Sequence, residues 1–126
     1  MKQPESTPTE KPYDLHERLL VFACDIVRAV QFLHRRDAVA RELSYQILAA
    51  GTSVGANYEE SDGASSLADF VAKTRIALKE AKETRFRLRL CHRSGLLSAE
   101  FEPLVRESDE IVRILGKIVH KARRGL

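Results

Sequence analysis

Proline is missing from most of this 126-residue sequence. Three of its four prolines lie within residues 1–12 and the fourth is Pro103, so the stretch from Tyr13 to Glu102 contains none. Because proline removes an amide donor and clashes with the preceding helical turn, this absence permits long helices. We expect residues 1–12 to form a flexible arm and residues 13–126 to form one domain, since the length suits a single hydrophobic core.

Cysteine and long apolar runs are scarce as well. Cys24 and Cys91 lie singly within apolar helical patterns, and neither belongs to a Cys-x-x-Cys or Cys/His ligand spacing. We therefore expect both to be buried free thiols in a reducing cytoplasm. The first residues lack the apolar core of a signal peptide, and the uncharged run 43–58 is too short and too polar to span a bilayer.

Motifs typical of enzymes are also absent. None of the four histidines follows an acid at the Glu-x-x-His spacing of di-iron bundles. The segment GTSVG at 51–55 lacks the lysine of a phosphate-binding loop. The acids Glu59, Glu60 and Asp62 have no histidine at ligand spacing, which favours a solvated helix end over a metal site. We predict a non-enzymatic protein with no catalytic residues, no cofactor and no bound metal.

Helical periodicity dominates what is present. Apolar residues recur at alternating steps of four and three, and Asp37, Ser66 and Ser98 are suited to cap the helices that follow them. The predicted helices run from about Tyr13 to Arg36, from Ala38 to Glu60, from Ser66 to near Arg93, and from Ser98 to Arg124. Because no alternating strand pattern occurs, we predict an all-α fold, an antiparallel up-down-up-down four-helix bundle.

The apolar seams of the first and last helices define the expected core. The first is predicted to bury Leu15, Leu19, Phe22, Ile26, Ala29 and Leu33. The fourth is predicted to bury Phe101, Leu104, Ser108, Ile111, Leu115, Ile118 and Ala122. Both seams have the heptad-like spacing of helices packed in a bundle.

The second predicted helix carries no charge between Leu43 and Tyr58, although a helix in an isolated bundle normally shows water a charged face. Gly51 and Gly55 lie in its middle, and each costs about 0.5–1 kcal/mol relative to alanine. Two interpretations compete. A neighbouring subunit covers the outer side of the helix, giving a homo-oligomer, or the helix breaks near the glycines into a loop that forms a site. The oligomer is favoured.

Polar residues on this helix need hydrogen-bond partners if a subunit interface buries them. Ser53 and Asn57 lie one turn apart and are predicted to satisfy each other or a carboxylate, with Glu83 of the third helix as the candidate. The acids ending at Glu60 oppose the helix dipole. We therefore expect them to meet a basic partner, either Arg41 or a neighbouring subunit.

Charge divides the sequence into an acidic and a basic part. Residues 1–70 hold 7 Lys/Arg and 11 Asp/Glu, whereas residues 71–126 hold 14 and 7. Two stripes of cations recur at helical spacing in the basic part: Arg75, Lys79, Lys82, Arg89 and Arg93 on the third helix, and Arg113, Lys117, Lys121 and Arg124 on the fourth. Cations in this pattern suit the phosphate backbone of RNA or DNA.

A solvated or inter-subunit face is the alternative interpretation of these stripes. Glu83 follows Lys79 by four residues and Asp109 precedes Arg113 by four, which allows pairing within each helix. Phe86 is the only aromatic residue beside the first stripe, so the sequence gives little support for stacking on unpaired bases.

Four segments together resemble a known bacterial family: DLHERLLVFACDIV, TSVGANYEES, SLADFVAKTRIALKEAKET and RLRL. Their order and spacing are similar to those of four-helix bundle proteins encoded within intervening sequences of large-subunit ribosomal RNA genes. Where the family has Ser-x-x-x-Asn and then an acid, this chain has Ser53, Asn57, Glu59 and Glu60; Phe70 and Ala81 to Thr84 also match. Arg87 replaces an aromatic residue of many relatives.

The resemblance implies a ring of bundles, typically a homopentamer with a central channel. A distantly similar bundle binds nucleic acid and the polymerase as an accessory subunit of retroelement reverse transcriptases. We therefore expect a cytoplasmic, non-enzymatic homo-oligomer that contacts RNA or DNA backbone through its basic helices. The alternative is a purely structural or protein-binding scaffold, whose basic helices pair with acidic helices of neighbouring subunits.

Overall fold

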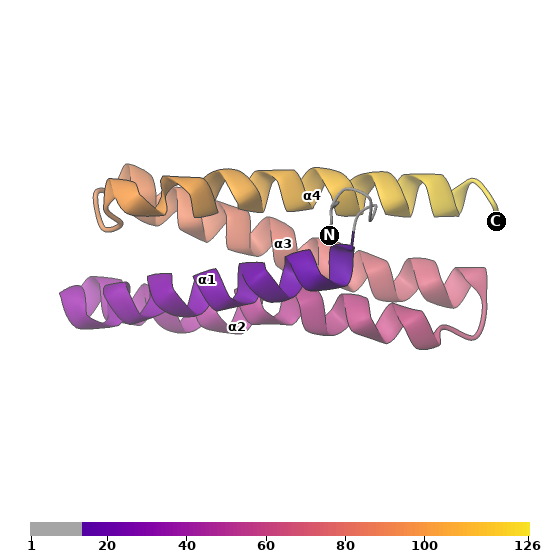
Figure 1. Cartoon of the computed structure of the whole chain (residues 1–126), viewed down its shortest axis with the longest axis horizontal. Helices are drawn as coiled ribbons and strands as arrows, with labels where there is room; N and C mark the ends of the chain where they lie inside the picture. The colour runs from indigo at the N-terminus through magenta and orange to yellow at the C-terminus, as the bar shows by residue number, and fades with distance from the viewer. Residues whose placement is uncertain (1–13) are drawn as a thin grey trace, which may run out of the picture.

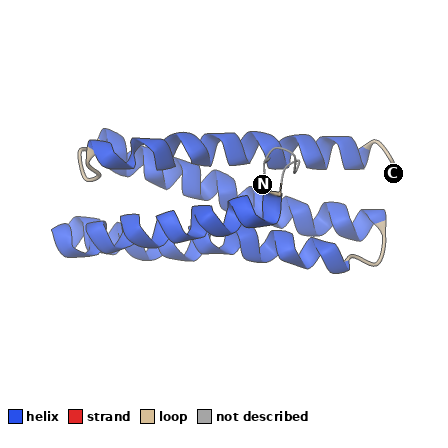
Figure 2. Cartoon of the chain, viewed as in Figure 1, coloured by secondary structure: helices blue, strands red, loops and turns tan. Residues whose placement is uncertain are grey.

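The computed structural model describes residues 14–126, which form four long helices and two short 3-10 turns (Figures 1 and 2). The long helices are α1 (Leu15–Arg36), α2 (Ala38–Glu60), α3 (Leu67–Arg93) and α4 (Glu102–Arg123), and the turns are η1 (Ser61–Gly63) and η2 (Ala99–Phe101). No strand occurs in this part of the chain. The predicted all-α four-helix bundle is confirmed, while the predicted arm (1–12) lies outside the described residues.

The helices α2 and α3 begin directly after the capping residues that the sequence predicts, Asp37 and Ser66. Asp37 Oδ1 accepts a hydrogen bond from the amide three residues later at 2.9 Å, and Ser66 Oγ accepts one from the amide of Asp69 at 3.0 Å. The Asp69 carboxylate in turn accepts from the amide of Ser65 at 3.0 Å and from Lys73 at 2.7 Å. These bonds satisfy amides that have no acceptor within the helix.

The fourth helix begins later than predicted. Ser98 makes no capping bond through its side chain; η2 follows it, and α4 starts at Glu102 with Pro103 in its first turn. Proline is well tolerated there because first-turn amides have no helical acceptor in any case. Gly95, with φ of 83°, follows the end of α3 in a backbone conformation that favours glycine.

The core follows the α1 seam as predicted but departs from the α4 seam near the carboxyl terminus. Val112 and Val119 are buried, whereas Ile118 and Ala122 are only partly buried. In Figure 1, α1 begins partway along the length of α4, and these two helices approach each other less closely than neighbouring helices elsewhere. The carboxyl end of α4 extends beyond α1 and packs mainly against α3 (Figure 1).

The two glycines of α2 bring its backbone close to α1. A Cβ atom on Gly51 would lie 2.8 Å from the Ile26 side chain, and one on Gly55 would lie 3.3 Å from Leu19 Cβ. The helix is continuous through both glycines, so the less favoured alternative, a break into a loop, is wrong. The cost of the two glycines to helix stability is offset by close packing of α2 on α1 within the same chain. Larger residues at these positions would push the two helices apart.

Candidate nucleic-acid interface

The predicted cations of α3 are exposed and lack carboxylate partners. Arg75, Lys79, Lys82, Arg89 and Arg93 form no ion pair with any residue between positions 14 and 126. Glu83, the acid expected to neutralise Lys79, instead accepts from Arg87 Nε at 3.3 Å. This stripe therefore retains its full positive charge toward water.

The other cations of α3 are held by acids. Arg85 Nη1 lies 2.9 Å from Asp109 Oδ1 of α4, and Lys73 Nζ lies 2.7 Å from Asp69. A cation already paired must give up its carboxylate before it contacts a phosphate, whereas an unpaired cation loses only water. The structure thus separates structural cations from those available to a ligand.

On α4, three of the four predicted cations are unpaired among the described residues: Lys117, Lys121 and Arg124. Arg113 pairs with Asp109 at 2.9 Å, as its spacing predicted. The four surround a hollow of about 690 Å³ that also includes Gly116 and His120. A Cβ atom on Gly116 would meet nothing within 4 Å, so packing does not explain this glycine.

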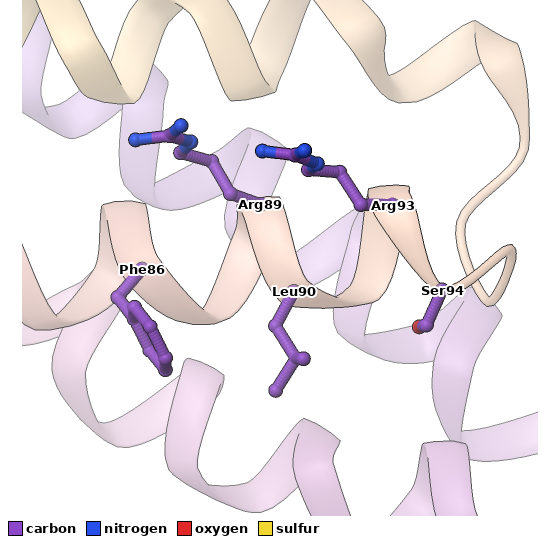
Figure 3. Close-up of a pocket in the computed structure, with 5 residues that line it drawn as sticks. All are labelled: Phe86, Arg89, Leu90, Arg93 and Ser94. Atoms are coloured by element: carbon purple, nitrogen blue, oxygen red, sulfur yellow. The ribbon is translucent and has the colours of Figure 1, made fainter.

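Three hollows link the two stripes into one surface. The first lies on α3 and is lined by Phe86, Arg89, Leu90, Arg93 and Ser94 (Figure 3). The second, of about 500 Å³, is lined by Arg89, Val105, Arg106, Asp109, Glu110 and Arg113. The third is the hollow around Gly116. Arg89 borders the first and second, and Arg113 borders the second and third, so one surface runs from Arg93 to Arg124, basic at both ends and interrupted in its middle by Asp109 and Glu110. We call it the α3–α4 surface.

Some parts of the α3–α4 surface were not predicted from the sequence. Arg106, Gly116 and His120 line its hollows without having been singled out. Two of them could have been predicted from helical spacing. Arg106 lies seven residues before Arg113 and His120 lies seven after it, which places all three on one face of α4. Three predicted cations of α3, in contrast, line none of these hollows: Arg75, Lys79 and Lys82.

Residues 13–117 match the family described as 23S rRNA-intervening sequence protein. The chain belongs to this family. A similar solved structure is a protein with unknown function from the S23 ribosomal protein family of Bacteroides thetaiotaomicron, at 39% identity over 84% of this chain and 98% of that chain, with a TM-score of 0.76. No curated protein matches the chain. The match to the 23S rRNA-intervening sequence protein family includes Arg89 and Arg113 but ends before Lys121 and Arg124.

The polar residues of the family-like segment in α2 are satisfied within their own helix. Ser53 Oγ donates to the carbonyl four residues earlier at 2.6 Å, and Asn57 Nδ2 donates to the Ser53 carbonyl at 2.8 Å. Of the two predicted alternatives, mutual contact is confirmed in part, because Asn57 donates to the Ser53 carbonyl, whereas among the described residues Glu83 is held by Arg87 and accepts from neither.

The acids near the end of α2 lie beside His16 and not beside Arg41, while the other predicted partner, a neighbouring subunit, stays a prediction. His16 Nε2 lies 3.1 Å from Asp62, and Nδ1 lies 3.8 Å from Glu59. Arg41 is at the opposite end of α2, where it donates to a carbonyl of α1, so it cannot serve Glu60. In the part of the chain that the structure covers, no group of three His, Cys, Asp or Glu residues is arranged to hold a metal.

A second distinctive surface of this 23S rRNA-intervening sequence protein is apolar. Leu20 and Val27 on α1, and Tyr45 and Leu48 on α2, are exposed; Leu20 and Tyr45 are 59% and 53% exposed. We call these four residues the α1–α2 surface.

Cys24 is also exposed, which corrects the prediction that both cysteines are buried, whereas Cys91 is buried as expected. None of the helices α1 to α4 is long and apolar enough to cross a membrane.

Proposed function

We propose that this protein is a non-enzymatic, cytoplasmic homo-oligomer that binds the phosphate backbone of RNA or DNA through the α3–α4 surface. The observation that carries this proposal is the succession of three hollows joined by Arg89 and Arg113. Cations along a continuous surface match a polyanion, whose phosphates repeat along the strand. Isolated surface cations would not produce such a match.

The charge state of the α3–α4 surface supports binding. Lys117, Lys121 and Arg124 have no carboxylate partner among residues 14–126, and neither have Arg89 and Arg93. Each can therefore displace counterions from a phosphate without breaking an ion pair. Such contacts position a nucleic acid without reading its sequence, so we expect sequence-tolerant binding.

Gly116 offers independent support for a ligand over the third hollow. A glycine inside a helix costs about 0.5–1 kcal/mol relative to alanine, and here no neighbouring side chain requires it. The missing side chain leaves the backbone of α4 open between Arg113 and Lys117. Close approach of a phosphate group to this backbone would account for the glycine.

The oligomeric part of the proposal rests on the α1–α2 surface, which we assign to a second copy of the chain. The run of α2 from Leu43 to Tyr58 leaves its outer side without charge, and Leu20 and Val27 add exposed apolar side chains on α1. The bundle in each subunit is antiparallel, as the pairing of later α2 positions with earlier α1 positions supports. The ring and its five subunits are inferred from the family resemblance.

Binding and assembly can be tested together with a triple charge reversal, Arg89→Glu, Lys117→Glu and Lys121→Glu. Fluorescence anisotropy with labelled RNA and DNA oligonucleotides measures affinity, and light scattering after size exclusion measures mass. We expect wild-type affinity to fall at least about tenfold between 50 and 200 mM salt, and the variant to lose binding at unchanged mass. The double variant Arg28→Glu, Arg35→Glu on α1 is the control and should bind normally.

The scaffold alternative makes the opposite prediction for this variant. If the basic helices pair with acidic helices of neighbouring subunits, charge reversal lowers the mass toward 14.2 kDa. A wild-type protein that binds neither RNA nor DNA at low salt would overturn the nucleic-acid part of the proposal. Binding that persists in the variant would remove the α3–α4 surface as its site.

A further inference from the structure

Phe86 is the most exposed aromatic side chain that the structure describes outside the core, at 66%. It has no aromatic partner within residues 14–126, and it borders the same hollow as Arg89 and Arg93. Exposure of this extent leaves most of a large apolar ring in water, which is unfavourable. A ring needed for the core would be covered, so the exposed position points to a ligand or partner.

The two kinds of side chain in this hollow lie on different sides of α3. Figure 3 shows Phe86 and Leu90 directed away from α4, whereas Arg89 and Arg93 are directed toward it. The hollow has a volume of about 470 Å³, within the range of small-molecule sites. It therefore joins an apolar wall to a cationic wall across the surface of one helix.

We propose that this hollow holds one unpaired nucleotide of a single strand, with its base stacked on the Phe86 ring and its phosphate at Arg89 and Arg93. The proposal rests on the proposed function, since the strand reaches the hollow along the α3–α4 surface. A backbone that follows the cations on the α4 side places its bases over the opposite side of α3, where Phe86 and Leu90 stand. Aromatic rings beside cations are a common arrangement in single-strand binding.

Single-stranded nucleic acid is favoured over a duplex as the ligand of this hollow. Bases in a duplex are stacked on one another and paired, so their faces are unavailable to Phe86. An unpaired base has a free face, and every base can stack, which keeps the site tolerant of sequence. Phe86 should therefore contribute to the affinity for single strands and contribute little to the affinity for duplexes.

The experiment uses the absence of tryptophan from the chain. In a Phe86→Trp variant of the full-length protein, tryptophan emission reports on this position alone. We expect quenching when a single-stranded oligonucleotide is added and no quenching with inorganic polyphosphate, which has the charge but no bases. Phe86→Ala should weaken single-strand binding at least about fivefold and leave duplex binding unchanged. Ile76→Ala, an exposed apolar residue of α3 outside the hollow, is the control.

The outcomes separate this proposal from the proposed function. If anisotropy shows binding but the Phe86→Trp emission does not respond to single strands, the stacking site is overturned and the proposed function stands. If the wild-type protein binds no nucleic acid, both fail. If the emission changes with protein concentration alone, the hollow accepts a side chain from a second copy, and the nucleotide assignment is overturned.

Discussion

Arg18 of α1 and Glu107 of α4 form a two-point ion pair, with distances of 2.6 Å from Nε to Oε2 and 2.8 Å from Nη2 to Oε1. Both side chains are about 30% exposed, so water screens the pair only in part. Planar guanidinium and carboxylate groups suit this arrangement and fix the relative orientation of the two helices. The pair bridges two helices that otherwise approach each other less closely than their neighbours do.

We expect Glu107→Ala to lower the free energy of unfolding by about 1–2 kcal/mol, because it removes both charge-assisted hydrogen bonds. Urea denaturation measures the change, and Glu110→Ala on the exposed side of α4 is the control. A double-mutant cycle with Arg18→Ala isolates the interaction between the two residues. A coupling energy of zero would show that the pair does not hold α1 to α4.

Alanine substitutions at two helical glycines should have opposite effects on stability. In Gly51→Ala the new Cβ atom lies 2.8 Å from the Ile26 side chain, so this buried side chain or α1 itself must shift, and overpacking of this kind costs about 1–3 kcal/mol. In Gly116→Ala the new atom meets nothing, so the helix gains about 0.5–1 kcal/mol. Thermal unfolding measures both. If phosphate approaches the α4 backbone, Gly116→Ala should also weaken nucleic-acid binding while raising Tm.

The starts of α2 and α3 followed from the sequence because the predicted caps, Asp37 and Ser66, agree with the apolar spacing there. The start of α4 did not, since Ser98 looks like a cap but Pro103 places the first helical turn later. The close packing of Gly51 against Ile26 was also not predicted. Helical spacing shows that a residue is small, but only the packing shows which neighbour approaches it.

The candidate site was predicted as two stripes, and the structure was needed to join them. Spacing along one helix places Arg89 on a face of α3 and Arg113 on a face of α4, but it carries no information about which faces adjoin. The same limit explains the error at Glu83, whose two possible partners, Lys79 and Arg87, both lie at helical spacing. Side-chain packing decides between them in favour of Arg87.

The two cysteines should react with thiol reagents at very different rates. Burial raises the pKa of the Cys91 thiol, which lowers its thiolate fraction and also blocks access, whereas Cys24 is exposed. We expect one thiol to react with Ellman's reagent in the native protein and both to react in denaturant. Cys24→Ser should abolish the native reaction. Equal rates for both thiols in the folded protein would contradict the burial of Cys91.

Acid should weaken the start of α3 through Asp69. Its hydrogen bond with Lys73, and then the one with the amide of Ser65, hold the pKa of this carboxyl below its ordinary value of 3.8. A lowered pKa stabilises the fold at pH values above 3.8, and the contribution is lost as the pH falls through the value in the folded state. Asp69→Asn should therefore lower Tm at neutral pH but approach wild type as the pH falls well below 3.8. A Tm difference that stays constant with pH would exclude this linkage.

The oligomer is best tested at Leu48, at the centre of the uncharged run of α2. Wild-type protein should have a mass that is a multiple of 14.2 kDa and is the same at low and high salt, because apolar contacts are not screened. Leu48→Glu places a charge in the proposed contact and should give the monomer mass, since a buried unpaired charge is very unfavourable. Ile76→Glu makes the same change on α3, outside the α1–α2 surface, and should leave the mass unaltered.

A wild-type monomer would refute the assembly and leave the exposed Leu20 and Tyr45 without a partner. Dissociation by salt alone would instead assign the contact to the charged helices.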